Sequence, residues 1–353
     1  MNATLRVPRA HGGPNALAAA RYDFSTNSNA CGPCPQALAA LQAADATRYP
    51  DAGYTALRAT LAEFHGVDAW RVVLAGSASE FIFRISAWAW QQGGRTVSLP
   101  THAYGDYAHA AQAWGLQLTP DVNTADLVWA CEPSSPLGQA HLNWPQALGT
   151  TSSSGIDAGK APLLVLDRAY APLRLEGAPS LSAAQLSCVW QLFSPNKALG
   201  LTGVRAAYAL APLRAEHAVV QMDALAPSWV VGAHGVALLT AWTQAATQDW
   251  LQSSLQTLRV WKQQQIQGLQ AMGWQCLPSD TPFFCARPPA DRSLSELLAV
   301  LRTQGIQLRD ATSFGLPGYV RLGVLPPQAQ AALLSTLTAA ASPETTTSDT
   351  ISS

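Results

Sequence analysis

The sequence predicts an α/β fold in which a large domain, with a mostly parallel sheet covered by helices, is joined to a smaller α+β domain. Short apolar segments alternate with helical patterns between residues 72 and 166, as expected for parallel strands that are buried on both faces. From about residue 226 the pattern becomes helical and then ends in strand-like pieces. The chain has 353 residues, which is enough for one large domain and one smaller domain.

The strands expected in the large domain are short, and polar residues follow each of them. These strands are residues 72–74, 96–99, 127–131 and 163–166. A helix begins after the first strand, because Ser77 and Glu80 have the spacing of a capping box, and a second helix is expected over 104–114. Since ligands bind at the carboxyl ends of parallel strands, we expect the polar residues that follow these strands to line a site.

Two further regions flank the large domain. Helices are expected before it, through Leu38 and Leu41 and through Leu57 and Leu61. The strand-like pieces after it are residues 283–285, 306–309 and 319–322. The expected division of the chain is an N-terminal segment that packs with the small domain (1–45), the large domain (46–225), the small domain (226–340) and a disordered tail (341–353).

The composition excludes several classes of function. The net charge is −1 and no basic stripe is visible, so we expect no nucleic-acid partner. No apolar run has the length of a membrane span, and no secretory signal opens the chain, so we expect no membrane partner. The six cysteines are scattered without a framework spacing, which indicates reduced thiols in a cytoplasmic protein.

One cysteine pair needs separate treatment, because Cys31-Gly32-Pro33-Cys34 between a strand and a helix resembles a thioredoxin-type redox site. No tryptophan precedes Cys31, and the pair is too near the N-terminus for the strands that would precede such a site. A metal site built from cysteines would need two more ligands at matching spacing. We therefore disfavour both a redox role and a metal role.

Lys197 is the main candidate for catalysis. It lies between an apolar run that ends at Phe193 and a glycine-punctuated stretch that leads to Arg205. Burial there would favour the neutral, nucleophilic amine, and such an amine forms Schiff bases with aldehydes. The alternative is a surface lysine beside a loop.

Residues 194–205 resemble the Ser-x-x-Lys-x-x-Gly-Leu-x-Gly-x-Arg segment of the fold-type I pyridoxal-phosphate enzymes, the class I and II aminotransferase superfamily. The phosphate turn at 77–80, Asp167 and the late strand around Arg321 occur in family order, and the resemblance covers residues 10–335. It implies pyridoxal 5'-phosphate as the cofactor, with a Schiff base to Lys197.

The resemblance also implies a role for each residue around the cofactor. Asp167 would face the pyridine nitrogen, although it could instead cap a helix. Tyr104 would stack on the ring, and Tyr170 and Ser135 would approach the phenolate oxygen. The residues implied to hold the phosphate are Ser77, Ala78, Ser79, Ser194 and Arg205, with Tyr49 lent by the second subunit of a homodimer.

Within this family the chain looks closest to threonine-phosphate decarboxylase and histidinol-phosphate aminotransferase. The features that favour the decarboxylase are His11-Gly12-Gly13, the segment 23–29, and the arginine-bearing segments around Arg309 and Arg321. By this resemblance His11, Asn27, Arg309 and Arg321 bind the phosphate and carboxylate of a small phosphorylated amino acid. The alternative for the two arginines is a set of interdomain salt bridges.

The expected reaction is decarboxylation of L-threonine O-3-phosphate, as in cobalamin synthesis. The first alternative is an aminotransferase of the histidinol-phosphate or aromatic type, and the second is a degenerate homologue that binds the cofactor without turnover. Three residues depart from the family pattern: Ser135 stands where an asparagine is usual, Arg168 where a glutamate is usual, and Asn196 where a small residue is usual. These departures bear on substrate and rate more than on cofactor binding.

Overall fold

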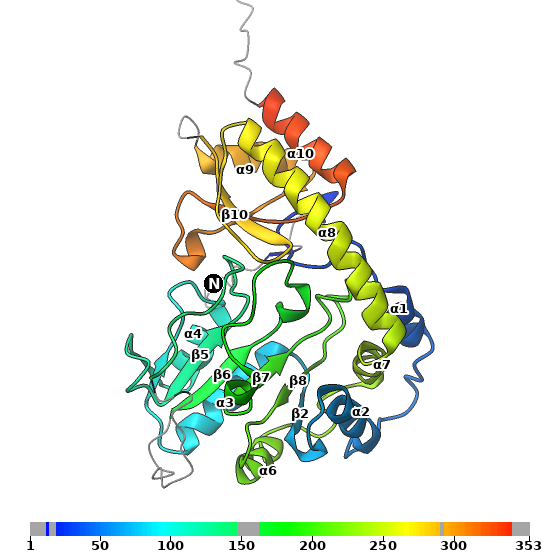
Figure 1. Cartoon of the computed structure of the whole chain (residues 1–353), viewed down its shortest axis with the longest axis vertical. Helices are drawn as coiled ribbons and strands as arrows, with labels where there is room; N and C mark the ends of the chain where they lie inside the picture. Colours follow the sequence, from blue (N-terminus) through cyan, green and yellow to red (C-terminus); the bar gives the residue numbers. More distant parts are fainter. Residues whose placement is uncertain (1–11, 14–18, 147, 149–161, 290–292, 341–353) are drawn as a thin grey trace, which may run out of the picture.

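The computed structural model describes residues 12–13, 19–146, 148, 162–289 and 293–340. Figure 1 shows the large sheet with its helices in the lower part of the molecule, and the smaller sheet with further helices in the upper part. The expected tail (341–353) lies outside the described residues, and the division into domains at the expected boundaries stays a prediction.

The large sheet has the strand order β2-β8-β7-β6-β5-β3-β4. Its strands are β2 (Val72–Ala75), β3 (Thr96–Ser98), β4 (Gln117–Leu118), β5 (Leu127–Cys131), β6 (Leu163–Asp167), β7 (Trp190–Phe193) and β8 (Ala207–Leu210). β8 runs antiparallel to its neighbours β2 and β7, while the other pairs are parallel. The prediction of a mostly parallel sheet is confirmed.

Side chains of the large sheet alternate between two apolar layers. Val72 and Leu74 of β2 pack in one hydrophobic cluster, and Val73 and Ala75 pack in another on the opposite face. Helices cover both faces: α2 (Thr55–His65), α3 (Ala78–Gln91), α4 (Gly105–Ala113), α5 (Ala183–Leu186), α6 (Glu216–Ala224) and α7 (Ala233–Trp242). Strands that are buried on both faces explain the near-continuous apolar runs of the sequence.

Helix α3 begins at the predicted position, but only half of the expected capping box forms. Ser77 is the N-cap, and its hydroxyl accepts a hydrogen bond from the Glu80 backbone N–H at 3.1 Å. The Glu80 carboxylate does not return to Ser77. It accepts instead from the Gly76 N–H at 3.1 Å and pairs with Arg84 at 2.9 Å, because α3 brings Arg84 one turn further along the same face.

The smaller sheet has the order β12-β13-β10-β9, and the strand β1 pairs in parallel with β11 beside it. These strands are β1 (Tyr22–Asp23), β9 (Gln275–Cys276), β10 (Phe283–Arg287), β11 (Ile306–Gln307), β12 (Arg309–Asp310) and β13 (Val320–Gly323). The Gly323 N–H donates to the Phe24 carbonyl at 2.7 Å, so the N-terminal segment lies against the small sheet.

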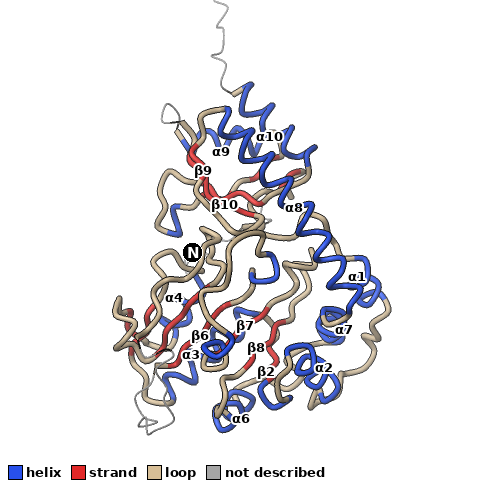
Figure 2. Tube along the Cα trace, in the orientation of Figure 1, coloured by secondary structure: helices blue, strands red, loops and turns tan. Residues whose placement is uncertain are grey.

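The remaining helices connect the two sheets or cover the smaller one, and Figure 2 shows α8 running from the small sheet toward α1 and α7. They are α1 (Pro35–Gln42), α8 (Ala245–Ala271), α9 (Leu294–Thr303) and α10 (Pro327–Ala339), with the short turns η1 (Ala69–Arg71), η2 (Ala171–Leu173) and η3 (Thr312–Phe314). Among the described residues, none of these helices combines the length and apolar character that crossing a bilayer requires. All six cysteines are free thiols.

Candidate active site

A cleft of about 1000 Å³ lies at the carboxyl ends of the central strands and reaches the small sheet. Its walls come from the segments that follow β2, β5, β6 and β7, and from β13. The predicted site residues that line it are Asn27, Ser77, Ala78, Ser79, Tyr104, Ser135, Asp167, Tyr170, Ser194, Lys197, Arg205 and Arg321. Residues that are up to 294 positions apart in the sequence therefore share one cavity.

Lys197 is held in this cleft by its own loop. Its Nζ donates to Ser194 Oγ at 3.2 Å. Burial lowers the pKa of Lys197, and although the Asp167 carboxylate opposes this effect, the Arg205 guanidinium adds to it. Asn196 braces the loop, since its Nδ2 donates to the carbonyls of Thr202 at 3.3 Å and Val204 at 3.2 Å. The reading of Lys197 as a surface lysine is wrong.

The carboxylate of Asp167 is buried at the end of β6, and both of its oxygens accept a hydrogen bond. The Tyr107 hydroxyl donates to Oδ2 at 2.7 Å, and the Ala169 N–H donates to Oδ1 at 2.9 Å. Burial raises the pKa of Asp167, while these bonds and Lys197 oppose the rise. The alternative role of helix cap is wrong, because Tyr170 is the N-cap of the turn η2.

The N-terminus of α3 points into the cleft beside Ser77, Ala78 and Ser79. The first N–H groups of a helix lack intrahelical partners and carry partial positive charge, so this position suits an anion such as phosphate. Ser79 Oγ lies 3.3 Å from the hydroxyl of Tyr104, and Arg205 is exposed at the mouth of the cleft.

Tyr170 presents a protonated hydroxyl to the cleft. Burial raises the pKa of Tyr170 to about 12, with Arg321 opposing the rise. Its hydroxyl accepts from Asn27 Nδ2 at 3.4 Å, and its ring packs edge-on against Phe283 at 4.8 Å. The Tyr170 O–H proton is therefore available for a ligand.

Arg321 extends from β13 into the cleft and is buried without an acidic partner among the described residues. Its Nη2 donates to the Ser25 carbonyl at 2.7 Å, and its Nη1 donates to Ser135 Oγ at 3.3 Å. Its Nε and the Asn27 Oδ1 have no hydrogen-bond partner in the described structure. Buried polar atoms are nearly always paired, so these two atoms indicate that the cleft receives a polar ligand.

Comparison of this sequence with known protein families identifies the family of the chain. The sequence pattern of the family "Aminotransferase class I and II" matches residues 155–337, just over half of the chain. The chain belongs to the class I and II aminotransferase family. It is therefore a fold-type I pyridoxal-phosphate enzyme, as the sequence resemblance implies.

The relatives and solved structures that resemble this chain carry two names. A histidinol-phosphate aminotransferase from Jannaschia sp. is 27% identical over 337 residues, covering 90% of each chain. The solved histidinol-phosphate aminotransferase of Sinorhizobium meliloti, in complex with pyridoxal 5'-phosphate, has a TM-score of 0.73 at 20% identity and covers 90% of each chain. The L-threonine-O-3-phosphate decarboxylase of Porphyromonas gingivalis has a TM-score of 0.70 at 21% identity, covering 90% of this chain and 98% of that one.

Three of the predicted site residues are not among the described residues that line the cleft. His11 is outside the described residues, although Gly12 packs so closely that a Cβ there would lie 2.1 Å from the Ser25 carbonyl oxygen. Arg309 lies opposite Arg321 on the neighbouring strand and donates to Ser313 Oγ at 2.7 Å, outside the residues that line the cleft. Tyr49 is 76% exposed and stacks on Trp229 at 4.4 Å, away from the cleft of its own subunit.

Tyr107 and Phe314 are among the lining residues that sequence reasoning did not name. Phe314 lines the cleft, and the guanidinium groups of Arg309 and Arg321 lie 5.0 and 5.5 Å from its ring centre. No sequence signal marks Phe314, which belongs to a short turn. Tyr107 could have been found, because it lies in the first turn of the helix that Tyr104 precedes as N-cap.

The departures from the family pattern have structural explanations in this chain. Ser135, which stands where an asparagine is usual, accepts a hydrogen bond from Arg321 Nη1 at 3.3 Å. The side chain of Arg168 lies outside the cleft, where it donates to Gln191 Oε1 at 2.6 Å and covers the Phe193 ring at 5.1 Å.

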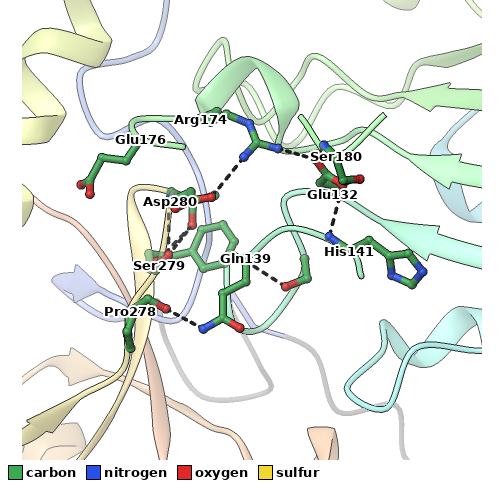
Figure 3. A network of polar contacts seen from close by, with 12 residues as sticks. Glu132, Gln139, His141, Arg174, Glu176, Ser180, Pro278, Ser279 and Asp280 are labelled. Carbon is green, nitrogen blue, oxygen red and sulfur yellow. Dashed lines mark hydrogen bonds and ion pairs between the residues drawn. The ribbon is translucent and has the colours of Figure 1, made fainter. Parts of the chain in front are cut away.

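A polar network beside the cleft joins the loop after β5 to the small sheet (Figure 3). The buried Glu132 carboxylate accepts from Arg174 Nη2 at 2.9 Å and from the Ser180 N–H at 2.7 Å. Arg174 also pairs with Asp280 at 3.1 Å, and the Asp280 N–H donates to the Gly138 carbonyl at 2.7 Å. The network therefore fixes the loop that carries Ser135.

Proposed function

We propose that this enzyme binds pyridoxal phosphate through Lys197 and transfers an amino group between a phosphate-bearing amine of the histidinol-phosphate type and a 2-oxo acid. The observation that carries the proposal is the meeting of Lys197, Asp167 and Arg321 in one cleft. The histidinol-phosphate aminotransferases among the relatives favour amino transfer over other reactions of the family.

The residues of the cleft fit the cofactor. Asp167 would lie against the ring nitrogen, and Tyr104 against the ring face. Tyr170 would donate to the phenolate oxygen, because its hydroxyl keeps its proton and faces the cleft. The phosphate would occupy the N-terminus of α3 with Ser194 and Arg205. When bound, the cofactor withdraws electrons from the bonds of the substrate's α-carbon.

The chain's own residues supply binding, orientation and proton transfer. Lys197 is the base that would move the proton of the α-carbon, since burial favours its neutral form. Arg321 would hold the anionic group of the substrate with its Nε, and so help decide which bond stands perpendicular to the ring. The small sheet that carries Arg321 closes one side of the cleft and limits access of water.

The anion that Arg321 binds bears on decarboxylation. A carboxylate that leaves as carbon dioxide loses its charge, so an ion pair with Arg321 would stabilise the starting state more than the transition state. Decarboxylation of L-threonine O-3-phosphate would therefore need Arg321 to hold the phosphate and leave the carboxylate free. Histidinol phosphate has no carboxylate, so in amino transfer Arg321 would hold its phosphate, and then the carboxylate of the 2-oxo acid in the second half-reaction.

Decarboxylation of L-threonine O-3-phosphate is the second candidate, and the N-terminal segment favours it. A Cβ on Gly12 would lie 3.2 Å from Arg321 Nη2, and the Gly13 N–H donates to Ser25 Oγ at 2.9 Å. Gly12 therefore lies beside the arginine, and we propose that this segment adds a second contact for a phosphate.

We also propose that the enzyme is a homodimer. The exposed Tyr49 would then reach the cofactor phosphate of the second subunit, because it cannot serve the cleft of its own subunit from its position on Trp229.

The product spectrum tests the proposed reaction. The purified enzyme with pyridoxal phosphate would be incubated with histidinol phosphate or L-threonine O-3-phosphate, with and without 2-oxoglutarate, and the products identified by mass spectrometry. We expect glutamate to form only when histidinol phosphate and 2-oxoglutarate are both present, and Lys197→Ala to abolish it. An aminopropanol phosphate formed without 2-oxoglutarate would replace amino transfer by decarboxylation.

A further inference from the structure

Tyr107 is a buried phenol that the roles described so far do not use. It lies on α4, it is fully buried, and its hydroxyl donates to Asp167 Oδ2 at 2.7 Å. The other oxygen of Asp167 accepts from the Ala169 N–H at 2.9 Å. Two donors on two oxygens fix the plane of the carboxylate, which a single donor would leave free to rotate.

The ring of Tyr107 also connects the two residues that would contact the cofactor ring. It stacks on Trp129 at 4.5 Å with an angle of 13°, and it meets Tyr104 edge-on at 5.8 Å and 83°. Tyr107 therefore supports Asp167 through its hydroxyl and Tyr104 through its ring edge. Close packing on Trp129 leaves it little freedom to move away.

We propose that Tyr107 is a positioning residue that holds the Asp167 carboxylate, oriented and charged, against the ring nitrogen of the cofactor. The inference rests on the proposed function. A charge-assisted hydrogen bond stabilises the carboxylate in a site where burial disfavours it. With the carboxylate charged, the proton shared between Asp167 and the ring stays on the ring nitrogen, where it increases electron withdrawal.

The other groups that face Asp167 do not replace this bond. Lys197 attracts the carboxylate across the cleft, and Cys131 is opposite it on β5. Burial raises the pKa of Cys131, so it is a neutral thiol and a weak donor. Lys197 is committed to the cofactor aldehyde in the loaded enzyme. Tyr107 and the Ala169 N–H are then the strong donors to Asp167 among the described residues.

The test compares two deletions of a buried tyrosine hydroxyl. Tyr107→Phe removes the donor to Asp167. Tyr208→Phe is the matched control, because Tyr208 is also fully buried, lies on β8 of the same sheet, and bonds His65 at 2.8 Å and Trp242 at 3.1 Å outside the cleft. The purified enzymes loaded with pyridoxal phosphate would be titrated with pH while the visible absorption of the bound cofactor is recorded, and cofactor loss on dilution would be timed.

We expect Tyr107→Phe to raise the pH midpoint of the visible band by about one unit and to speed cofactor loss by roughly tenfold, the size of one charge-assisted hydrogen bond. The midpoint should rise because, without the Tyr107 donor, the shared proton would move from the ring nitrogen toward Asp167. A ring without this proton withdraws fewer electrons, so the nitrogen that joins Lys197 to the cofactor would keep its own proton to higher pH. Tyr208→Phe should leave both quantities unchanged.

A second variant keeps the side chain and changes only the strength of the donor. Fluorotyrosine at position 107 is a more acidic phenol and donates a stronger hydrogen bond to Asp167. It should therefore lower the pH midpoint of the visible band, whereas Tyr107→Phe should raise it. A midpoint that stays at the wild-type value in both variants would overturn the inference and leave the proposed function standing. A wild-type protein that binds no pyridoxal phosphate would overturn both.

Discussion

Burial shifts the pKa of three ionisable side chains, Lys197, Asp167 and His65, away from their ordinary values. Burial lowers the pKa of Lys197, which favours the neutral amine. Burial raises the pKa of Asp167, while the hydrogen bonds from the Tyr107 hydroxyl and the Ala169 N–H oppose the rise by stabilising the carboxylate. His65 shows the same effect away from the cleft, where it lies 2.8 Å from the Tyr208 hydroxyl. The residue types were predictable from the sequence, but the burial that sets their chemistry depends on long-range packing.

The titration of His65 gives a prediction at this scale. Burial lowers the pKa of His65 to about 4, and the nearby Arg168 adds to the effect. The unfolded chain binds the proton below its ordinary pKa, about 6.5, while the folded chain does not until about pH 4. The neutral His65 ring therefore contributes to stability above pH 6.5, and this contribution is lost as the pH falls toward 4. Between pH 7 and pH 4.5 the free energy of unfolding should fall by about 2 kcal/mol for this reason.

Urea unfolding at pH 7 and pH 4.5 would measure this loss. His65→Gln keeps a polar group near Tyr208 but does not titrate, so its stability should fall by about 2 kcal/mol less than that of the wild type over this range. Equal losses in both proteins would show that His65 is not the titrating group.

At the scale of the elements, the sequence predicted the features that depend on neighbouring residues, such as a buried strand or the start of a helix. The strand 127–131 and the start of α3 are as expected, because a buried apolar run and a capping serine are sequence signals. β8 was not predicted, since its place between β2 and β7 depends on pairing with distant segments. Phe314 was missed for the same reason, because a short turn brings it to Arg321 only in the folded chain.

The network around Glu132 gives a prediction for the loop after β5. Arg174→Met removes the cation from a carboxylate whose side chain is only 4% exposed, so it should destabilise the protein by about 3 kcal/mol. The ion pair of Arg48 and Asp45 is the control, because its side chains are 86% and 58% exposed, and Arg48→Met should change stability by less than about 0.5 kcal/mol.

Urea unfolding of the two variants measures both effects. The double variant with Glu132→Gln and Arg174→Met should recover part of the loss, because it no longer buries an unpaired charge. A loss in Arg174→Met no larger than in Arg48→Met would mean that the network does not anchor the loop.

At the scale of the whole molecule, the cleft exists because two sheets meet. The large sheet supplies Lys197 and Asp167, the small sheet supplies Arg321, and the N-terminal segment contacts both through Asn29 and β1. The Asn29 N–H donates to the Lys197 carbonyl at 2.9 Å, and Gly32 packs against Gly200. The turn 31–34 thus supports the lysine loop by packing, with both of its cysteines as free thiols.

The site residues of the large sheet could be predicted because polar residues follow its strands and because the segment 194–205 resembles that of a known family. The meeting of Arg321 with Ser25 and Ser135 could not, because it depends on how the two sheets are placed. The same limit applies to the reaction, since the bond that breaks depends on an orientation that only the folded cleft sets.

Chemical trapping of the cofactor tests the central claim most directly. The chain has three lysines, Lys160, Lys197 and Lys262, so the attachment site can be read without ambiguity. The enzyme loaded with pyridoxal phosphate would be reduced with borohydride, digested, and analysed by peptide mass spectrometry. We expect the added mass of the cofactor on the peptide that contains Lys197, and on that peptide alone; attachment to another lysine, or to none, would contradict the account.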